Sequence, residues 1–287
     1  MSQPENIAYF PKQPEYRGKA NTTRKSSPAP GGRGLLALSW TVPVVIVIIW
    51  ETLAQLGAIS PHILPAPSKV LGTALKLTLH GTLLNDLKVS LTRAVAGFLI
   101  GGSLGFTLGT LVGFSKVANA LLDRSLQMLR SIPFLALLPL VIVWLGVAEA
   151  QKIFLVSLSV LFPMYINTTL GIRQVDPKLI ELGKVNGLTL WQMIVRIILP
   201  AALPSILTGV RYSLATAWLA LVVAETIGAT AGLGFMAMDA REFLRTDVII
   251  LTLIIYALIG AGADSIARFL ERTLLSWHPN YVAGERR

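Results

Sequence analysis

The chain has 287 residues, of which 53% are hydrophobic and 14% are charged, whereas soluble domains carry about 25% charged residues. Its net charge of +10 does not indicate a nucleic-acid binder, because Lys and Arg lie in short segments between long apolar runs and not on one basic face. The sequence has no cysteine, which excludes disulfides, thiol catalysis and cysteine-ligated metal sites.

Residues 1–34 are rich in Pro, Gly, Ser, Lys and Arg and contain almost no aliphatic side chains. Such a segment buries too little apolar surface to offset the entropy of ordering, so we predict a disordered basic tail. The rest of the chain, residues 35–287, is predicted to form a single transmembrane domain.

Six apolar runs in this domain are long enough to cross a membrane, since about 20 helical residues span a hydrocarbon core of about 30 Å. They cover residues 35–57, 89–114, 121–147, 150–172, 203–227 and 248–269. Pro133 and Pro139 are predicted to interrupt the third run, and Pro163 the fourth. Such breaks are tolerated where neighbouring helices or a cavity satisfy the freed carbonyls, so they hint at a pathway without proving one.

The Lys and Arg residues predict the orientation, because the cytoplasmic segments of membrane proteins carry an excess of them. With a cytoplasmic amino terminus, 17 of them lie in inner segments and 6 in outer segments, and Arg93 and Arg211 within spans complete the total of 25. Arg130 is counted among the inner residues. We therefore predict a multi-pass protein with both termini in the cytoplasm.

Glycines recur every four residues in the second run, at Gly97, Gly101, Gly105, Gly109 and Gly113. On a helix this spacing places them in one stripe, where a second helix backbone can approach closely. Helix packing is the ordinary role of such a stripe, and the alternative is that it lines a gate.

The segment at about residues 173–200, between the fourth and fifth runs, carries signals for two short helices. Asp176 is a candidate N-cap with Pro177 at the first helical position, and Gly187 stands where a left-handed residue would end that helix. Thr189 and Gln192 have the spacing of a capping box for a second helix, which a proline at position 200 is expected to close. A flexible connector would not need two sets of caps.

The same segment resembles the EAA signature of binding-protein-dependent ABC importer permeases. The sequence from Glu181 reads E-L-G-K-V-N-G-L-T-L-W-Q-M-I-V-R-I-I-L-P. The residues in register with the signature are Glu181, Gly187, Ile197, Leu199 and Pro200, while Leu182 and Gly183 replace its two alanines. The resemblance implies that this segment docks into a groove of a cytoplasmic ATPase and acts as a coupling loop.

Residues 63–281 further resemble the branch of these permeases that carries aliphatic sulfonates, taurine, nitrate and related small anions. Three phrases are closest to the aliphatic sulfonate permeases: Q-M-L-R-S-I-P from Gln127, A-R-E-F-L-R-T-D-V from Ala240 and S-W-H-P-N-Y from Ser276. Taurine, nitrate or another small anion is the alternative substrate.

The resemblance as a whole implies an all-α, six-helix bundle of the MetI-like permease type in the bacterial cytoplasmic (inner) membrane. Its expected partners are a cytoplasmic ATP-binding subunit, a periplasmic or lipid-anchored solute-binding protein, a second copy of the chain and the lipid bilayer. Nucleic acid is not an expected partner. The implied mechanism is alternating access, in which ATP binding closes the ATPase dimer and the coupling loop transmits that motion to the spans.

Charged residues within spans are costly, at about 2.5 to 3.5 kcal/mol for a cation at the centre of the bilayer, so each needs a partner or an interface. Arg93 and Glu225 fall near the outer ends of their runs, and Arg211 falls near an inner end. One alternative is that these residues are structural, through an Arg93–Glu225 pair or through snorkelling to an interface. The other is that an arginine attracts an anionic substrate. Thr216 and Trp218 are further candidates for a translocation pathway.

The sequence shows no catalytic residues, and we expect neither a metal nor a cofactor. It has no G-x-x-x-x-G-K-[ST] phosphate loop, and its histidines, His62, His80 and His278, lack metal-ligand spacing. The chain is therefore interpreted as a permease subunit, not as an enzyme. An intramembrane enzyme and a self-sufficient channel or secondary transporter are the rival hypotheses.

Overall fold

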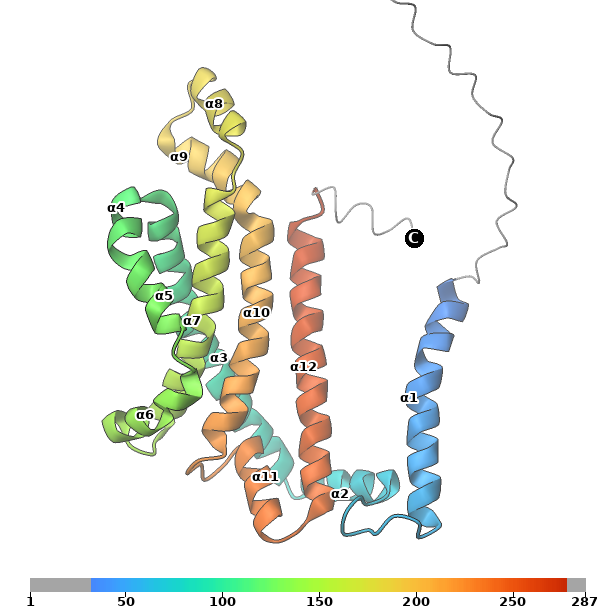
Figure 1. The fold of residues 1–287 in the computed structure, drawn as a ribbon. Coiled ribbons are helices and arrows are strands. Elements are labelled where there is room, and N and C mark those ends of the chain that lie inside the picture. Colours follow the sequence, from blue (N-terminus) through green and yellow to red (C-terminus); the bar gives the residue numbers. More distant parts are fainter. Residues whose placement is uncertain (1–31, 278–287) are drawn as a thin grey trace, which may run out of the picture. The chain divides into compact units, whose positions relative to one another are not determined.

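The computed structural model describes residues 32–277, and every regular element in that range is a helix (Figure 1). The chain divides into two units, Met1–Ile49 and Trp50–Arg287. The described part of the first unit belongs to helix α1 (Gly32–Gln55). The predicted disordered tail, residues 1–34, lies outside the described residues except for residues 32–34, which begin α1.

The second unit contains the remaining helices. The elements in chain order are α2 (Pro67–Leu79), α3 (Thr82–Phe114), α4 (Lys116–Ala118), the π-helical turn η1 (Asn119–Asp123), α5 (Arg124–Arg130), the 3₁₀ turn η2 (Phe134–Leu137), α6 (Leu138–Leu145), α7 (Glu149–Arg173), α8 (Pro177–Val185), α9 (Leu190–Met193), the π-helical turn η3 (Ile194–Ile198), α10 (Leu199–Glu225), α11 (Leu233–Glu242) and α12 (Thr246–Leu274).

Four helices of the described chain are long and apolar enough to cross a membrane: α3, α7, the continuous helix Leu190–Glu225 and α12. The pair Lys116–Arg130 and Phe134–Leu145 makes a fifth span if it is counted as one, although it bends by 86°. The first predicted run lies on α1, whose described apolar part, Trp40–Gln55, is shorter than the others. Six spans therefore stay a prediction, while the all-helical membrane fold is confirmed.

The prolines act differently from one another. Pro133 lies at the break between α5 and η2, as predicted, but Pro139 lies in the first turn of α6, where its missing N–H costs nothing. The prediction that Pro163 interrupts its run is wrong, because α7 continues through it. Pro163 leaves the Ser159 carbonyl without its helical donor, and the Thr216 hydroxyl of α10 donates to that carbonyl at 3.2 Å.

The glycine stripe of α3 lies against α7 at backbone contact distance. A Cβ at Gly101 would lie 2.1 Å from the Ser157 carbonyl oxygen, and one at Gly105 would lie 2.4 Å from the Leu161 carbonyl oxygen. The same face ends at Gly113, where a Cβ would meet Ile172 at 3.0 Å. The stripe therefore packs two helices together, and it does not line an open gate in this structure.

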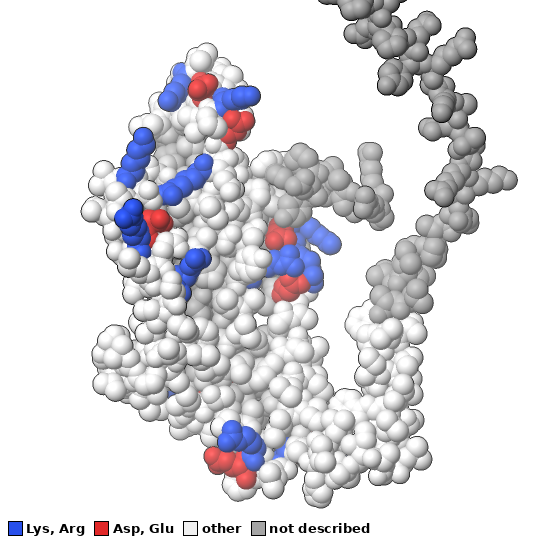
Figure 2. All heavy atoms as spheres, in the orientation of Figure 1, with Lys and Arg blue, Asp and Glu red and all other residues white. Residues whose placement is uncertain are grey.

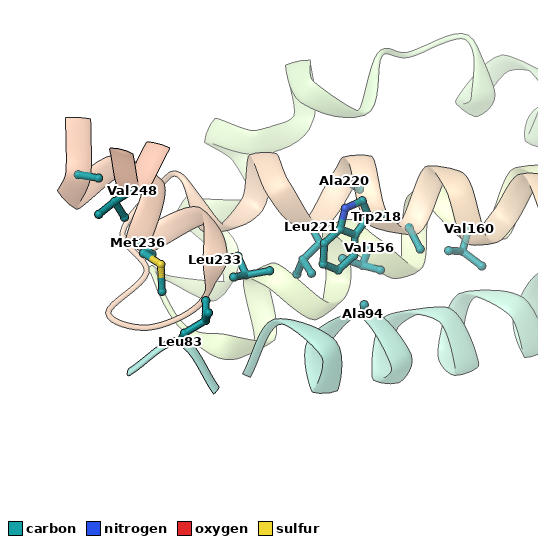
Figure 3. Packing of buried hydrophobic residues seen from close by; sticks show 12 residues of the cluster. Leu83, Ala94, Val156, Val160, Trp218, Ala220, Leu221, Leu233, Met236 and Val248 are labelled. Atoms are coloured by element: carbon teal, nitrogen blue, oxygen red, sulfur yellow. The ribbon is translucent and has the colours of Figure 1, made fainter. Parts of the chain in front are cut away.

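Helix α7 also packs against α10, so α3, α7 and α10 form the centre of the second unit. The main buried cluster combines Ala94 of α3, Val156 and Val160 of α7, and Trp218 and Leu221 of α10 (Figure 3). Leu233 and Met236 of α11 and Val248 of α12 extend it toward one end of the unit. The core therefore packs α11 and the start of α12 against the spans α3, α7 and α10.

The two ends of the second unit differ. Helices α8 and α9 project beyond the spans at one end, while α2 and α11 lie at the other (Figure 1). In the face shown in Figure 2, charged side chains gather around α8 and α9 and at the α11 end, with a broad uncharged region between them. One further charged cluster lies along α12. We call the two ends the coupling end and the α11 end.

We predict that Gly101→Ala destabilises the protein by about 1–3 kcal/mol, because the new methyl group meets backbone that can move only with α7. Gly102→Ala is the matched control, since its Cβ would meet only Val160 Cγ1, at an ordinary 3.8 Å. Thermal unfolding of the purified protein in detergent should show a lower midpoint for the first variant alone. Equal midpoints would contradict the close α3–α7 contact.

Candidate functional site

The coupling end is a compact helix-turn-helix unit formed by α8 and α9. Asp176 Oδ1 accepts a hydrogen bond from the Lys178 N–H at 2.9 Å, which caps α8. Gly187 has φ +69° and ends α8 in the left-handed region that favours glycine. Thr189 and Gln192 form the predicted capping box, with N···O distances of 3.3 Å and 3.0 Å. The two short helices therefore hold a fixed turn between them.

A small core holds α8 onto the next helix. A Cβ at Gly183 would lie 2.8 Å from Ile197 Cδ1 and 3.7 Å from Met193 Cε, so an alanine here would require the end of the Ile197 side chain to shift. Met193 is buried. Gly183, which replaces the second alanine of the signature, therefore faces Ile197 and Met193 in this small core.

The prediction that Pro200 closes the second helix is wrong. Leu190–Glu225 is one continuous helix, and Pro200 lies in the first turn of α10, immediately after the π-helical turn Ile194–Ile198. Within this turn the Leu199 N–H donates to the Ile194 carbonyl, five residues earlier. Pro200 has no backbone N–H and cannot donate a helical hydrogen bond. Because the π-helical turn has already shifted the hydrogen-bond pattern before this residue, the chain stays helical. The coupling unit is consequently joined to α10 without a flexible joint.

The outer surface of the coupling unit carries large exposed apolar side chains among its charged ones. Leu182, Val185, Leu190 and Trp191 are 58%, 86%, 81% and 72% exposed. Glu181 is also exposed, and its carboxylate has no hydrogen-bond or ion-pair partner among the described residues. Contiguous exposed apolar side chains rimmed by charge are typical of protein interaction sites.

At the α11 end, Arg93 of α3 lies at the centre of a buried ionic network. Its Nε and Nη2 donate to the two oxygens of Glu149, each at 2.6 Å. Its Nη1 donates to Glu225 Oε1 at 2.8 Å and to the Ala231 carbonyl at 2.7 Å. Arg93 and Glu225 are only 3% and 2% exposed. The predicted Arg93–Glu225 pair is therefore present, with Glu149 as a second anion.

The loop between α10 and α11 closes over the same network. The Ser90 hydroxyl lies 2.8 Å from both oxygens of Glu225, and the Gly234 N–H donates to Glu225 Oε2 at 2.9 Å. The Gly232 N–H donates to Asp86 Oδ1 at 2.9 Å. A Cβ at Gly232, where φ is +117°, would lie 2.6 Å from Glu225 Oε1. Helices α3, α7, α10 and α11 are thus joined at one point.

Arg211 lies in a different setting, on the face between α10 and α12. Its Nη2 is 2.7 Å from Asp264 Oδ1, and its Nη1 is 3.9 Å from Glu271 Oε2. Arg268 Nη1 pairs with the other oxygen of Asp264 at 2.5 Å. The side chain of Arg211 is 45% exposed and lines a cavity of about 650 Å³. Both carboxylates line that cavity as well, so one cation and two anions border it and its net charge is not positive.

The two remaining pathway candidates, Thr216 and Trp218, contact neighbouring helices and also border cavities, so their pathway role stays a prediction. Thr216 bonds to α7 through the Ser159 carbonyl, while one side of it faces a second cavity. Trp218 is 9% exposed and meets Tyr256 of α12 edge to face, with ring centroids 5.7 Å apart. The indole N–H of Trp218 has no partner among the described residues.

Comparison with known proteins identifies the family. Residues 82–276 match the family described as binding-protein-dependent transport system inner membrane component. The chain belongs to this family. SsuC of Escherichia coli (strain K12), a permease protein named for the transport of aliphatic sulfonates, is 50% identical over 242 residues, which cover 84% of this chain and 92% of SsuC.

TauC of the same organism, named a taurine transport system permease protein, is 36% identical over 248 residues, which cover 85% of this chain and 90% of TauC. A structure of the MetNI methionine ABC transporter in inward-facing conformations aligns with a TM-score of 0.51 at 22% identity. The alignment covers 69% of this chain and 98% of that chain, and it shows a shared fold.

The protein is therefore an inner-membrane permease subunit of an ABC transporter and not itself an enzyme. Its family implies an ATP-binding subunit and a solute-binding protein as partners. Within the described residues, no group of three or more His, Cys, Asp or Glu side chains could hold a metal ion.

Sequence reasoning missed several members of the two charged clusters in this permease. Glu149 was not singled out because it lies at the start of an apolar run, where an acid is common. Asp264 and Arg268 do carry a signal, since two opposite charges four residues apart in an apolar run indicate a pair on one helix face. The contact of Asp264 with Arg211 required the tertiary structure.

We predict that Arg93→Gln destabilises the permease by about 3–5 kcal/mol, because it leaves the carboxylate of Glu225 buried without its cation. Arg245→Gln is the control: it removes an exposed pair with Asp239 at the same end, worth about 0–1 kcal/mol. The thermal unfolding midpoint and the yield of folded protein should fall for the first variant only. A stable Arg93→Gln protein would show that the network is not structural.

Proposed function

We propose that this permease carries aliphatic sulfonates into the cell as part of an ATP-driven importer. The single observation behind this proposal is the higher identity to SsuC than to TauC, over a similar share of the chain. Taurine, nitrate or another small anion is the alternative substrate. Neither a self-sufficient channel nor an intramembrane enzyme is favoured, because the exposed coupling unit has no role in the former and the described spans show no catalytic pair for the latter.

A second copy of the chain is part of the proposal. The cluster of Arg211, Asp264 and Arg268 lies within the spans and is between one third and one half exposed. Charged groups facing lipid are costly, so this face of α10 and α12 is better accommodated against protein or a water-filled pathway. Two copies related by a twofold axis would bring two such faces together within the bilayer.

We place the coupling end, residues 1–34 and both termini on the cytoplasmic side. The excess of Lys and Arg in the segments assigned to the inside supports this orientation. The carboxyl end of α12 lies toward the coupling end of the second unit (Figure 1), in agreement with a cytoplasmic carboxyl terminus. The α11 end then faces the solute-binding protein.

The coupling loop, at about residues 173–200, is proposed as the contact with the ATPase. Its exposed apolar side chains offer the area for docking, and Glu181 offers a charge for a polar or basic site on the partner. Because α9 continues into α10 through the π-helical turn, a push on the loop would reach the spans directly. The loop thereby serves as the transmission element of alternating access.

The substrate assignment predicts that the complete transporter, with its ATPase and binding protein, takes up labelled butanesulfonate when ATP is supplied. A tenfold excess of taurine or nitrate should compete less well than unlabelled butanesulfonate, in line with a selectivity difference of about 1.4 kcal/mol or more. Uptake assays in proteoliposomes measure this. Stronger inhibition by taurine or nitrate would transfer the assignment to that anion.

The coupling assignment predicts that Gly187→Val and Glu181→Lys reduce ATPase association or ATP-driven uptake while insertion persists. Valine at φ +69° costs about 1–2 kcal/mol and would redirect α9, and lysine would reverse the charge presented to the partner. Lys184→Gln, on an exposed position of the same helix, is the control. Pull-down of the ATPase and uptake should be measured together. Wild-type values for both variants would make the loop a mere connector.

A further inference from the structure

A second cavity, of about 400 Å³, lies between the bent pair α5–α6, helix α7 and helix α10. Its walls are mainly aromatic and aliphatic and include Phe134, Val141, Trp144, Phe154 and Phe162. A volume of this size is within the range of about 300–1,000 Å³ for small-molecule sites. The Thr216 side chain, which spans the α7–α10 contact, also lines it.

Arg130 is the only charged residue among those that line this cavity. It is the last residue of α5, directly before the break at residues 131–133. Its side chain is exposed and has no hydrogen-bond or ion-pair partner among the described residues. An exposed arginine without a partner at the edge of an apolar cavity is suited to bind an anion there, because all of its guanidinium donors are free.

Arg130 differs from the two span arginines, Arg93 and Arg211, in what it can still bind. Arg93 is buried and shared between two carboxylates, and Arg211 faces Asp264 and Glu271 in its own cavity. An anion entering either place would meet negative charge. Arg130 faces no carboxylate in its cavity and keeps its planar fork of donors available for an anionic oxygen pair.

We propose that this cavity is an alkanesulfonate subsite, in which Arg130 binds the sulfonate head and the aromatic walls hold the alkyl chain. The inference rests on the proposed function, and it names the place where the substrate is recognised within the membrane. A charged head beside an apolar cavity matches an amphipathic small anion better than it matches nitrate, which has no apolar part. The Gln127–Pro133 segment, which carries one of the phrases resembling sulfonate permeases, forms the charged edge of the site.

Uptake by the complete transporter, reconstituted in phosphatidylcholine vesicles, tests the charged half of the site. Arg130→Gln should reduce uptake of butanesulfonate and octanesulfonate by about tenfold, and Arg130→Lys should retain part of it. Arg124→Gln is the matched control, because Arg124 is an exposed arginine at the other end of α5 that does not line the cavity. Its uptake should equal that of the wild type.

The alkyl half of the site is tested with Phe154→Ala, which enlarges the cavity. It should raise the ratio of octanesulfonate to butanesulfonate uptake by roughly tenfold, as a changed hydrophobic pocket does for chain length. Leu170→Ala, on the same helix and similarly exposed but outside the cavity, should leave the ratio unchanged. A ratio unaffected by Phe154→Ala would mean that lipid or packing fills the cavity, and it would overturn the site.

Failure of this inference and failure of the proposed function give different results. If Arg130→Gln transports both sulfonates as Arg124→Gln does, the subsite is wrong while sulfonate transport stands. If the wild-type transporter takes up no alkanesulfonate, the substrate assignment is wrong and the subsite falls with it. Should Arg130→Gln fail to assemble with the ATPase, the lysine variant and the chain-length ratio still decide the question.

Discussion

The contact of α3 with α7 through the glycine stripe is the constraint on which the rest of the second unit depends. Lipid is as apolar as the side chains, so spans in a membrane gain little from hydrophobic burial and associate through close packing and hydrogen bonds. Removing every side chain from one face of α3 lets its backbone reach the Ser157 and Leu161 carbonyls. Helix α7, fixed in this way, then supports α10 on its other side.

The α7–α10 contact illustrates how a helix breaker can become a link between helices. Pro163 frees the carbonyl of Ser159, and Thr216 of α10 donates to it. In water such a carbonyl would be hydrated, but within a membrane an unsatisfied group is costly, so the neighbouring hydroxyl is held in place. The same residue pair borders the cavity that also contains Arg130. The hydrogen bond that satisfies the freed carbonyl thus lies beside the proposed sulfonate subsite.

The two ends of the second unit are built for different tasks. At the α11 end, Arg93, Glu149 and Glu225 join α3, α7 and α10 through ion pairs, and the Gly234 N–H adds α11 by donating to Glu225, so these contacts resist relative motion of the four helices. At the coupling end, two capped helices stand free with apolar side chains exposed, yet they are fused to α10 through a π-helical turn. Under the proposed coupling role, motion received at the coupling end would reach α10, whose far end is held by the ion pairs of Arg93.

The sequence by itself determined the features that depend on local chemistry. The caps at Asp176 and Thr189, the left-handed Gly187 and the apolar length of the spans all follow from neighbouring residues, and the structure contains each of them. The all-helical class follows as well, because a chain this apolar satisfies its backbone groups in a membrane only within helices or a closed barrel.

Only the tertiary structure decided which charged side chains pair with one another. Arg93 and Arg211 look alike in sequence, but their partners come from residues far apart in the chain: Glu149 and Glu225 for Arg93, and Asp264 for Arg211. Whether Pro163 or Pro200 breaks a helix was decided in the same way, since the outcome depended on a donor from another helix and on the hydrogen-bond register of the preceding turn. Such contacts are set by how the helices pack, and local sequence does not encode them.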